Sequence, residues 1–224
     1  LKRIENNYGN NVIVELPNGK EGGMDNVDSE KGVERLFFGD FNAKVEYFVE
    51  PAFYAPTGFR ICRDSLDQHY VLEVKKVANY EQVKDQVQTE FPSRNTSMNL
   101  PEKQREENVA YNRKIWSKQG EEKLKRYRIE TKTVPVSDAF AELVHAKTFA
   151  TIDTFRTKGK PFVMFDGGWT TFRCVVEGDV WMLAIQVPAG DMKKLSDRYR
   201  QMMADVEADR FDEGRYLRLL EDIR

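Results

Sequence analysis

Side chains suited to acid–base chemistry are few in this sequence, apart from its carboxylates. It contains two histidines, His69 and His145, and neither has a second His, Cys or Glu at the spacing of a metal site. Its 37 Asp and Glu residues offer many combinations for hydrolysis by a carboxylate pair. No spacing singles out one pair, so the sequence assigns no catalytic residue.

Aromatic residues near turns, with arginines on adjacent strands, form the pattern that most favours a binding surface. Phe53 and Tyr54 lie in a predicted loop, Trp169 lies beside a predicted turn, and Arg60 and Arg173 lie on the strands nearby. Aromatic residues and arginine are enriched at recognition surfaces. We therefore predict a binding role for Tyr54, Arg60, Trp169 and Arg173, with packing in the core as the alternative role of the aromatics.

Motifs that bind a phosphate, a dinucleotide or a metal ion are absent from the sequence, so neither a cofactor nor a metal site is predicted. Gly167-Gly168 lacks the third glycine of a dinucleotide-binding loop and is typical of a hairpin turn. The acidic stretch 25–34 has Lys31 where a calcium-binding loop that began at Asn26 would need glycine.

The two cysteines, Cys62 and Cys174, are compatible with one disulfide or with two free thiols. Side chains alternate along a strand, so Cys62 shares a face with Arg60, whereas Cys174 shares one with Phe172. On a strand that faces the core, Cys174 would then be buried as a small hydrophobic residue. The sequence does not decide between the two states.

The overall charge excludes some classes of partner. With 35 Lys and Arg against 37 Asp and Glu, the net charge is −2, which provides no global basic field for nucleic acid. No apolar run approaches the ~20 residues that span a bilayer, so no transmembrane segment is predicted. The first residue is Leu1 rather than methionine. We expect an upstream signal or lipid-anchor segment, or else a trimmed chain.

Two stretches of the chain, 43–91 and 160–208, follow the same order of three strands and one amphipathic helix. Their middle strands share a Phe-Arg pair, Phe59-Arg60 and Phe172-Arg173. The alternation of apolar and polar residues predicts strands with one covered face and one solvent face. We predict an α+β fold with antiparallel sheet structure and helices packed on one side. Two pseudo-repeated β-β-β-α halves are one hypothesis, and a chance similarity is the other.

The predicted boundaries divide the chain into a loosely ordered N-terminal segment, 1–32, with one edge strand, and a single α+β domain, 33–224. Strands are predicted at 33–38, 43–49, 59–63, 69–77, 128–136, 161–165, 169–176 and 180–187. Helices are predicted at 80–91, 101–127 and 138–158, after Pro188, and after Asp212, which is expected to cap the last helix. Asn79 and Gln82 form a capping-box pattern, and the polar stretch 101–127 is expected to be one helix or a pair broken near Gly120.

The run Phe172-Arg173-Cys174-Val175-Val176, the run Val180-Trp181-Met182-Leu183 and the Met-rich helix after Pro188 resemble a family of uncharacterised, exported bacterial proteins. Such proteins are known mainly as domains of unknown function. The resemblance covers the second half of the chain, and its motifs are structural. It implies a bacterial source and a cell-envelope location, and it transfers no functional residue.

These patterns favour a non-catalytic module of the periplasm, the cell surface or the secreted fraction that binds a protein or a small ligand. The expected site lies between the two halves, because pockets favour such junctions. One alternative is a hydrolase that uses a carboxylate pair or an Asp–His arrangement, with His69 or His145 in a pocket. The other is a structural or assembly protein that buries a sheet edge in an oligomer.

Overall fold

The computed structural model describes residues 32–39, 41–64, 66, 68–158, 168–186 and 188–223, and also the backbone of 2–5 and 11–15. These residues confirm the α+β fold class. They form two compact units. Unit 1 contains Leu1–Lys76 and Glu130–Arg224, and unit 2 contains Val77–Ile129. Unit 2 is therefore an insertion between two strands, and each unit is described by itself.

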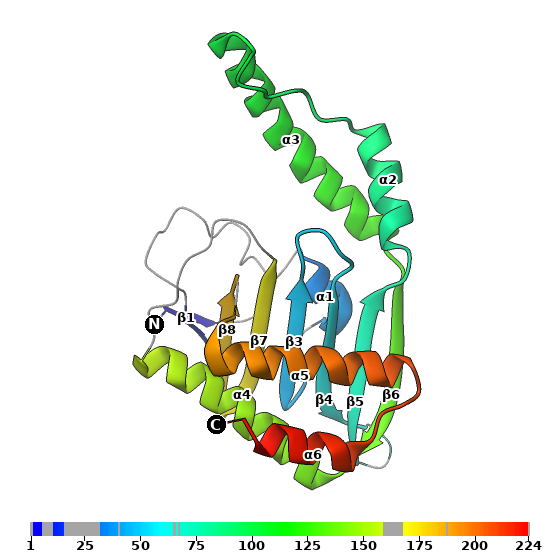
Figure 1. The fold of residues 1–224 in the computed structure, drawn as a ribbon, viewed down its shortest axis with the longest axis vertical. Coiled ribbons are helices and arrows are strands. Elements are labelled where there is room, and N and C mark those ends of the chain that lie inside the picture. The colour runs from blue at the N-terminus through cyan, green and yellow to red at the C-terminus, as the bar shows by residue number, and fades with distance from the viewer. Residues whose placement is uncertain are drawn as a thin grey trace. The chain divides into compact units, whose positions relative to one another are not determined.

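The sheet of unit 1 has the strand order β1-β2-β8-β7-β3-β4-β5-β6 (Figure 1). Strands β8 to β6 form a six-stranded antiparallel sheet, which β2 extends in parallel and β1 in antiparallel orientation. The N-terminal segment thus provides two strands rather than the one expected. The bounds are β1 Lys2–Glu5, β2 Asn11–Glu15, β3 Val45–Glu50, β4 Thr57–Arg63, β5 Tyr70–Val77, β6 Ile129–Val136, β7 Trp169–Val176 and β8 Asp179–Ile185.

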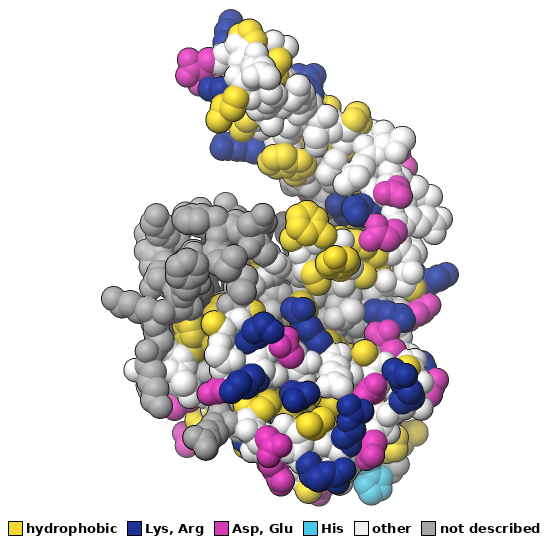
Figure 2. Space-filling model, viewed as in Figure 1, with side chains coloured by type: hydrophobic (Ala, Val, Ile, Leu, Met, Phe, Trp, Pro, Cys, Tyr) yellow, Lys and Arg dark blue, Asp and Glu magenta, His cyan; other side chains and the backbone are white. Residues whose placement is uncertain are grey.

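Three helices cover one face of this sheet: α4 (Asp138–Lys158), α5 (Gly190–Glu207) and α6 (Glu213–Glu221) (Figure 1). Ser137 caps α4 by accepting a hydrogen bond from the Phe140 amide at 3.1 Å. Asp212 caps α6, as predicted, by accepting one from the Arg215 amide at 3.1 Å. The outward surface around α5 and α6 carries Lys and Arg mixed with Asp and Glu, without a patch of one sign (Figure 2).

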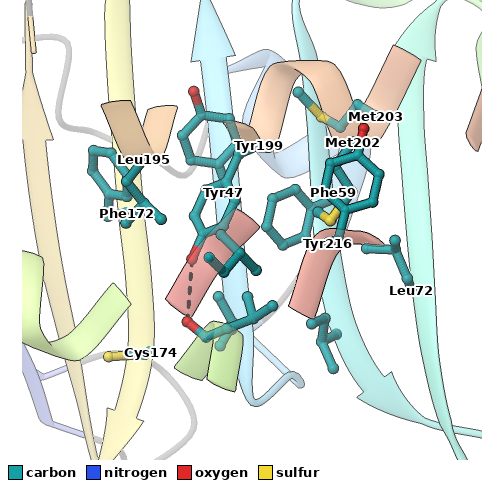
Figure 3. Close-up of a cluster of buried hydrophobic side chains, with 14 of the residues drawn as sticks. Tyr47, Phe59, Leu72, Phe172, Cys174, Leu195, Tyr199, Met202, Met203 and Tyr216 are labelled. Atoms are coloured by element: carbon teal, nitrogen blue, oxygen red, sulfur yellow. Dashed lines mark hydrogen bonds between the residues drawn. The ribbon is translucent and has the colours of Figure 1, made fainter. Parts of the chain in front are cut away.

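Aromatic rings make up the centre of the core between this face and α5 (Figure 3). The Tyr47 ring lies 5.5 Å from Phe59, 5.2 Å from Phe172 and 5.1 Å from Tyr199, between ring centroids. Tyr199 donates a hydrogen bond from its hydroxyl to the Val144 carbonyl at 3.1 Å, so its buried polar atom is satisfied. Each ring removes a large apolar area from water, and these packed rings hold α5 on the sheet.

The prediction of a strand at 33–38 was wrong, because these residues form the short helix α1 (Val33–Phe38). Val33 and Phe37 lie four residues apart and are buried together with Phe38, which is helical spacing. Gly39 ends the helix with a positive φ of 62°. Helix α1 packs on the face opposite α4, α5 and α6, where the Phe37 ring meets Phe48 at 5.4 Å. Helices therefore lie on both faces of the sheet, not on one.

The structure does not confirm the repeat. Helix α2 (Tyr80–Glu90), which ends the first predicted copy, belongs to unit 2, whereas α5, which ends the second, packs on the sheet. The strand predicted at 161–165 and residues 166 and 167 of the predicted turn lie outside the described residues.

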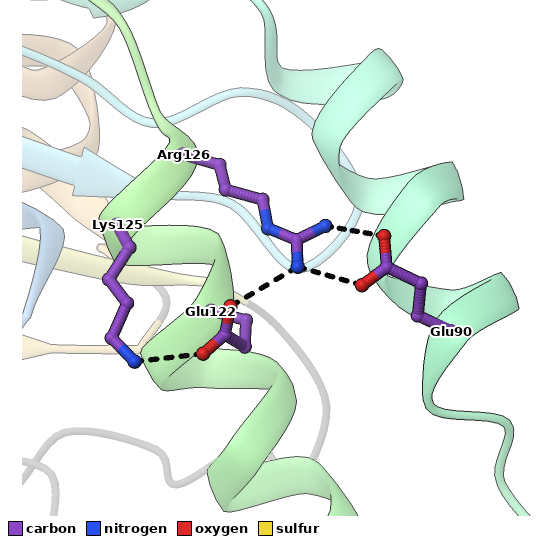
Figure 4. Close-up of polar contacts among 4 residues, drawn as sticks. All are labelled: Glu90, Glu122, Lys125 and Arg126. Carbon is purple, nitrogen blue, oxygen red and sulfur yellow. Dashed lines mark hydrogen bonds and ion pairs between the residues drawn. The ribbon is translucent and has the colours of Figure 1, made fainter.

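Unit 2 is a helical hairpin of α2 and α3 (Glu102–Arg126). Helix α3 runs through Gly120 without the predicted break. Near the base of the hairpin, Arg126 donates to both oxygens of Glu90 at 2.7 Å and to Glu122 at 3.2 Å (Figure 4). Such exposed ion pairs add little stability each, so the hairpin also depends on its buried polar contacts. No helix in the described part of the chain is both long and apolar enough to cross a membrane.

Asn79 occupies the N-cap position just before α2, as predicted, but its side chain makes no capping hydrogen bond. Its amide nitrogen donates to the Arg126 carbonyl at 3.0 Å, and its oxygen accepts from the Arg128 amide at 2.8 Å. The Ala78 amide also donates to the Arg128 carbonyl at 2.9 Å. Asn79 therefore joins the two chain segments at the base of the hairpin instead of completing a capping box.

Replacing Gly120 by alanine is expected to stabilise α3. A Cβ at this position meets no atom within 4 Å, and glycine inside a helix costs about 1 kcal/mol relative to alanine. Hydrogen exchange of the α3 amides in Gly120→Ala should slow by the factor that this free-energy difference implies. In the contrasting variant Gly168→Ala, the new Cβ would lie 2.3 Å from the Glu50 carbonyl oxygen, so the melting temperature should fall. Faster exchange in Gly120→Ala would contradict a continuous helix.

Candidate functional site

Four charged residues of alternating sign stand opposite one another across the centre of the sheet. Glu46 on β3 faces Arg173 on β7 and Arg60 on β4, and Arg60 in turn faces Glu73 on β5. All four side chains project from the face that α1 covers. We call Arg173, Glu46, Arg60 and Glu73 the charged row. Opposite charges directly across an antiparallel pair stabilise its register.

Short ion pairs connect the Arg173 end of the charged row to α1. Arg173 contacts Glu46 at 2.8 Å and Glu34 of α1 at 2.6 Å. One guanidinium is thus shared by two carboxylates, one from the sheet and one from the helix. Because a guanidinium presents several donors in one plane, it is suited to hold two acceptors at once.

The other end of the charged row contacts the last turn of α1. Arg60 contacts Glu73 at 2.9 Å, and Lys75 contacts the same carboxylate at 2.7 Å. Lys75 also donates to the Phe37 carbonyl and Arg60 to the Phe38 carbonyl. Cations at the C-terminus of a helix interact favourably with its dipole and unpaired carbonyls. The face predicted to be open to solvent is therefore covered, and its charges are paired within the protein.

The register explains why the sequence contains two Phe-Arg pairs. Phe59 and Phe172 both stand opposite Tyr47, and they pack against its ring on the face of α5. One residue further along each strand, Arg60 and Arg173 both stand opposite Glu46 on the other face. The two pairs are thus equivalent neighbours of one central dipeptide, Glu46-Tyr47. Their similarity does not require a duplicated gene segment.

Glu46 is the most perturbed carboxylate of the charged row. It is only 1% exposed, and its Oε1 has no hydrogen-bond partner among the described residues. Burial raises the pKa of this carboxyl from 4.5 to about 7, against the lowering effect of Arg173. The second carboxylate on Arg173, Glu34, raises the pKa further.

Replacing Glu46 by glutamine is expected to stabilise the protein at neutral and alkaline pH. The folded-state pKa of Glu46 is raised, so the folded chain binds more protons than the unfolded chain between pH 4.5 and about 7. Stability therefore falls as the pH rises through this window. Above pH 7, ionised Glu46 should cost about 3 kcal/mol, which Glu46→Gln removes.

Denaturant unfolding at pH 4 and pH 8 measures this difference. The advantage of Glu46→Gln should be present at pH 8 and largely absent at pH 4. Glu142→Gln is the control, since this exposed carboxylate makes a surface ion pair with Lys44 and should change stability by less than about 1 kcal/mol. A Glu46→Gln protein that is less stable than the wild type at pH 8 would show that the ionised pair with Arg173 is net stabilising.

The predicted aromatic residues lie at one end of the same strands. Phe53 and Tyr54 are 69% and 72% exposed in the loop between β3 and β4. Trp169, half-buried at the start of β7, stands opposite Glu50, the last residue of β3. A Cβ on Gly168 would lie 2.4 Å from the Pro51 Cα, so the two segments approach closely there. We call Phe53, Tyr54 and Trp169 the aromatic rim.

The four predicted binding residues thus fall into two groups. Tyr54 and Trp169 belong to the aromatic rim, whereas Arg60 and Arg173 belong to the charged row. The guanidinium groups of the row are engaged in internal ion pairs. Sequence reasoning missed Glu46 and Glu73 as the partners of these arginines. The sequence does contain a signal for these partners. When the strands are aligned by their Phe-Arg pairs, Glu46 beside Tyr47 and Glu73 beside Leu72 fall opposite the arginines.

The two histidines occupy different surroundings. His145 on α4 forms a 2.6 Å hydrogen bond from Nε2 to the Val175 carbonyl, which fixes its ring against β7. His69 lines a surface depression of about 400 Å³ together with Asp64 and Glu213. Its ring has no hydrogen bond to a carboxylate among the described residues. This depression is lined in part by Pro135, Val136 and Ser137, so it does not lie between the two predicted halves.

Both cysteines are free thiols. Cys174 faces the core under α4 and α5, and burial raises its pKa to about 12. Cys62 faces the other side of the sheet, because it neighbours Ile61, which points into the core. The two thiols therefore lie on opposite faces of the sheet, and this excludes the disulfide that the sequence had left open.

No protein-family model matches the chain, and no curated protein or solved structure is significantly similar to it. Among the described residues, no group of three or more His, Cys, Asp or Glu side chains is arranged to hold a metal ion.

Proposed function

We propose that this protein is a non-catalytic binding module of the cell envelope or the secreted fraction, and that it binds a protein partner through the aromatic rim. One observation carries the proposal: two adjacent aromatic side chains, Phe53 and Tyr54, are both more than two thirds exposed. Contiguous exposed apolar groups are characteristic of interaction sites, and aromatic residues dominate the energetics of such sites.

The sequence of the loop also supports a contact surface. Residues 51–59 contain no charged side chain, and Pro51 and Pro56 restrict the backbone on either side of the two rings. A restricted loop loses little conformational entropy when it binds. The loop connects β3 to β4, whose register the charged row and Tyr47 fix, so the rings project from a stable support.

A photoreactive phenylalanine analogue at position 53 tests this proposal in cells of the source organism. We expect a discrete adduct with one protein, and we expect Tyr54→Ser in the same chain to reduce it strongly, because a buried interface aromatic contributes about 2 kcal/mol or more. The matched control carries the analogue at Leu66, which is even more exposed, at 93%, on the turn between β4 and β5. Identical adducts from both positions, or none from position 53, would refute a binding role of the rim.

A hydrolase is a second candidate, favoured by the placement of His69 with Asp64 and Glu213 in one depression. Ser137 is not available there as a nucleophile activated by histidine, because its hydroxyl donates to Glu213 and caps α4. The candidate therefore requires a water molecule activated by His69 or a carboxylate. Hydrolysis of a panel of chromogenic esters and glycosides, lost at least about a hundredfold in His69→Gln, would favour it. Equal rates in both proteins would exclude it.

A further inference from the structure

An extended segment of unit 2 is fastened along α3 by side chains of that helix. Four of them, at spacings of four, four and three residues, lie on one face: Asn108, Asn112, Trp116 and Gln119. Each forms a hydrogen bond with the segment 91–95, which leads back from the end of α2. We call these four side chains the amide face and residues 91–95 the strap.

The amide face contacts mainly the main chain of the strap. Asn112 accepts a hydrogen bond from the Arg94 amide at 2.8 Å and donates to the Arg94 carbonyl at 2.9 Å. Asn108 donates to the Asn95 carbonyl at 2.7 Å, and Gln119 donates to the Phe91 carbonyl at 2.6 Å. A carboxamide that pairs with both main-chain groups of one residue recognises an extended backbone without regard to its side chain.

Two further contacts give the site a chemical preference. The Arg94 guanidinium lies 3.8 Å from the centroid of the Tyr111 ring, which is cation–π geometry. Trp116 donates from Nε1 to the Ser93 hydroxyl at 3.0 Å. The site therefore accommodates a small hydroxyl residue followed by arginine, on an extended main chain.

The strap buries little apolar surface. Its residues 92–95 are exposed, so water competes for their polar groups, and Phe91 is only half-buried. Segments with few buried apolar contacts open locally well before a protein unfolds. In contrast, Asn108, Asn112 and Gln119 are buried under the strap. Their amide groups would lose their hydrogen-bond partners if the strap left. Exchange of the strap for another extended peptide is therefore favoured over an empty amide face.

We propose that the amide face is a binding site for an extended peptide that carries a small hydroxyl residue followed by arginine, and that the strap occupies this site in the free protein. The proposal does not depend on the aromatic rim, because all of its contacts lie within unit 2. An incoming peptide would form the main-chain bonds with Asn108, Asn112 and Gln119 and place its arginine on Tyr111.

Fluorescence anisotropy with a labelled peptide of the strap sequence, residues 91–97, tests the proposal on the full-length chain. The variant Ser93→Gly/Arg94→Gly weakens the strap without changing α3. It should bind the peptide at least about tenfold more tightly than the wild type, because the competing segment has lost its two side-chain contacts. Equal affinity of the two proteins would overturn the proposal.

Substitutions in α3 then locate the bound peptide. In the weakened-strap background, Asn112→Ala should reduce affinity about tenfold through the loss of two main-chain hydrogen bonds, whereas Gln104→Ala, an exposed amide elsewhere on α3, should not. Tyr111→Leu keeps every amide, and it should abolish the preference for the peptide over its arginine-to-alanine version. Circular dichroism verifies that each variant is helical. Affinity that is unchanged in both Asn112→Ala and Tyr111→Leu would place the peptide elsewhere and refute the site.

Discussion

The burial of Glu46 and Tyr47 side by side on β3 is the constraint on which the rest of unit 1 depends. Adjacent residues of a strand point to opposite faces, so this one dipeptide requires an apolar neighbour on one face and a cation on the other. The strands on both sides of β3 meet the requirement with the same pair of residues, Phe-Arg, in register. A shift of either strand by one residue would place a guanidinium opposite Tyr47 in one direction, or a phenyl ring opposite Glu46 in the other, so both alternative registers are strongly disfavoured.

The two faces of the sheet follow from this arrangement. On one face, Tyr47 and its neighbours offer an apolar surface that α5 covers with Tyr199. On the other face, the charged row attracts the polar side of α1, while Phe37 packs on Phe48 and the ring of Phe38 lies over the space that Gly58 leaves free. A buried ionic row often contributes less to stability than apolar packing would, and in some proteins it specifies the pairing instead. Here it fixes the order β7-β3-β4-β5 and the place of α1.

Local patterns in the sequence predicted most elements of unit 1, since alternation and helical spacing reflect the same burial that the structure contains. The limits of β7 were predicted residue for residue, and the Asp212 cap and the core-facing parity of Cys174 were also predicted. The failures share a physical cause, which is that each depended on a partner far away in the chain. The segment Val33–Phe38 resembles a strand until the opposite face of the sheet is present, and Asn79 bonds to Arg126 and Arg128 rather than to its own helix. Only half of the candidate site could be predicted. The exposure of Tyr54 follows from its place in a loop, which the sequence indicates, whereas the partners of Arg60 and Arg173 depend on the register of the strands.

The pKa of Glu46 measures the central constraint most directly. A carbon-13 NMR titration of the glutamate side-chain carboxyls, with Glu46 assigned by comparison with Glu46→Gln, would report it in the folded protein. Burial beside one shared guanidinium predicts a midpoint of about 7, well above the ordinary 4.5. A midpoint at or below 4.5 would contradict this account, because a carboxyl that stays ionised at such a low pH is not desolvated between the sheet and α1 in the way described.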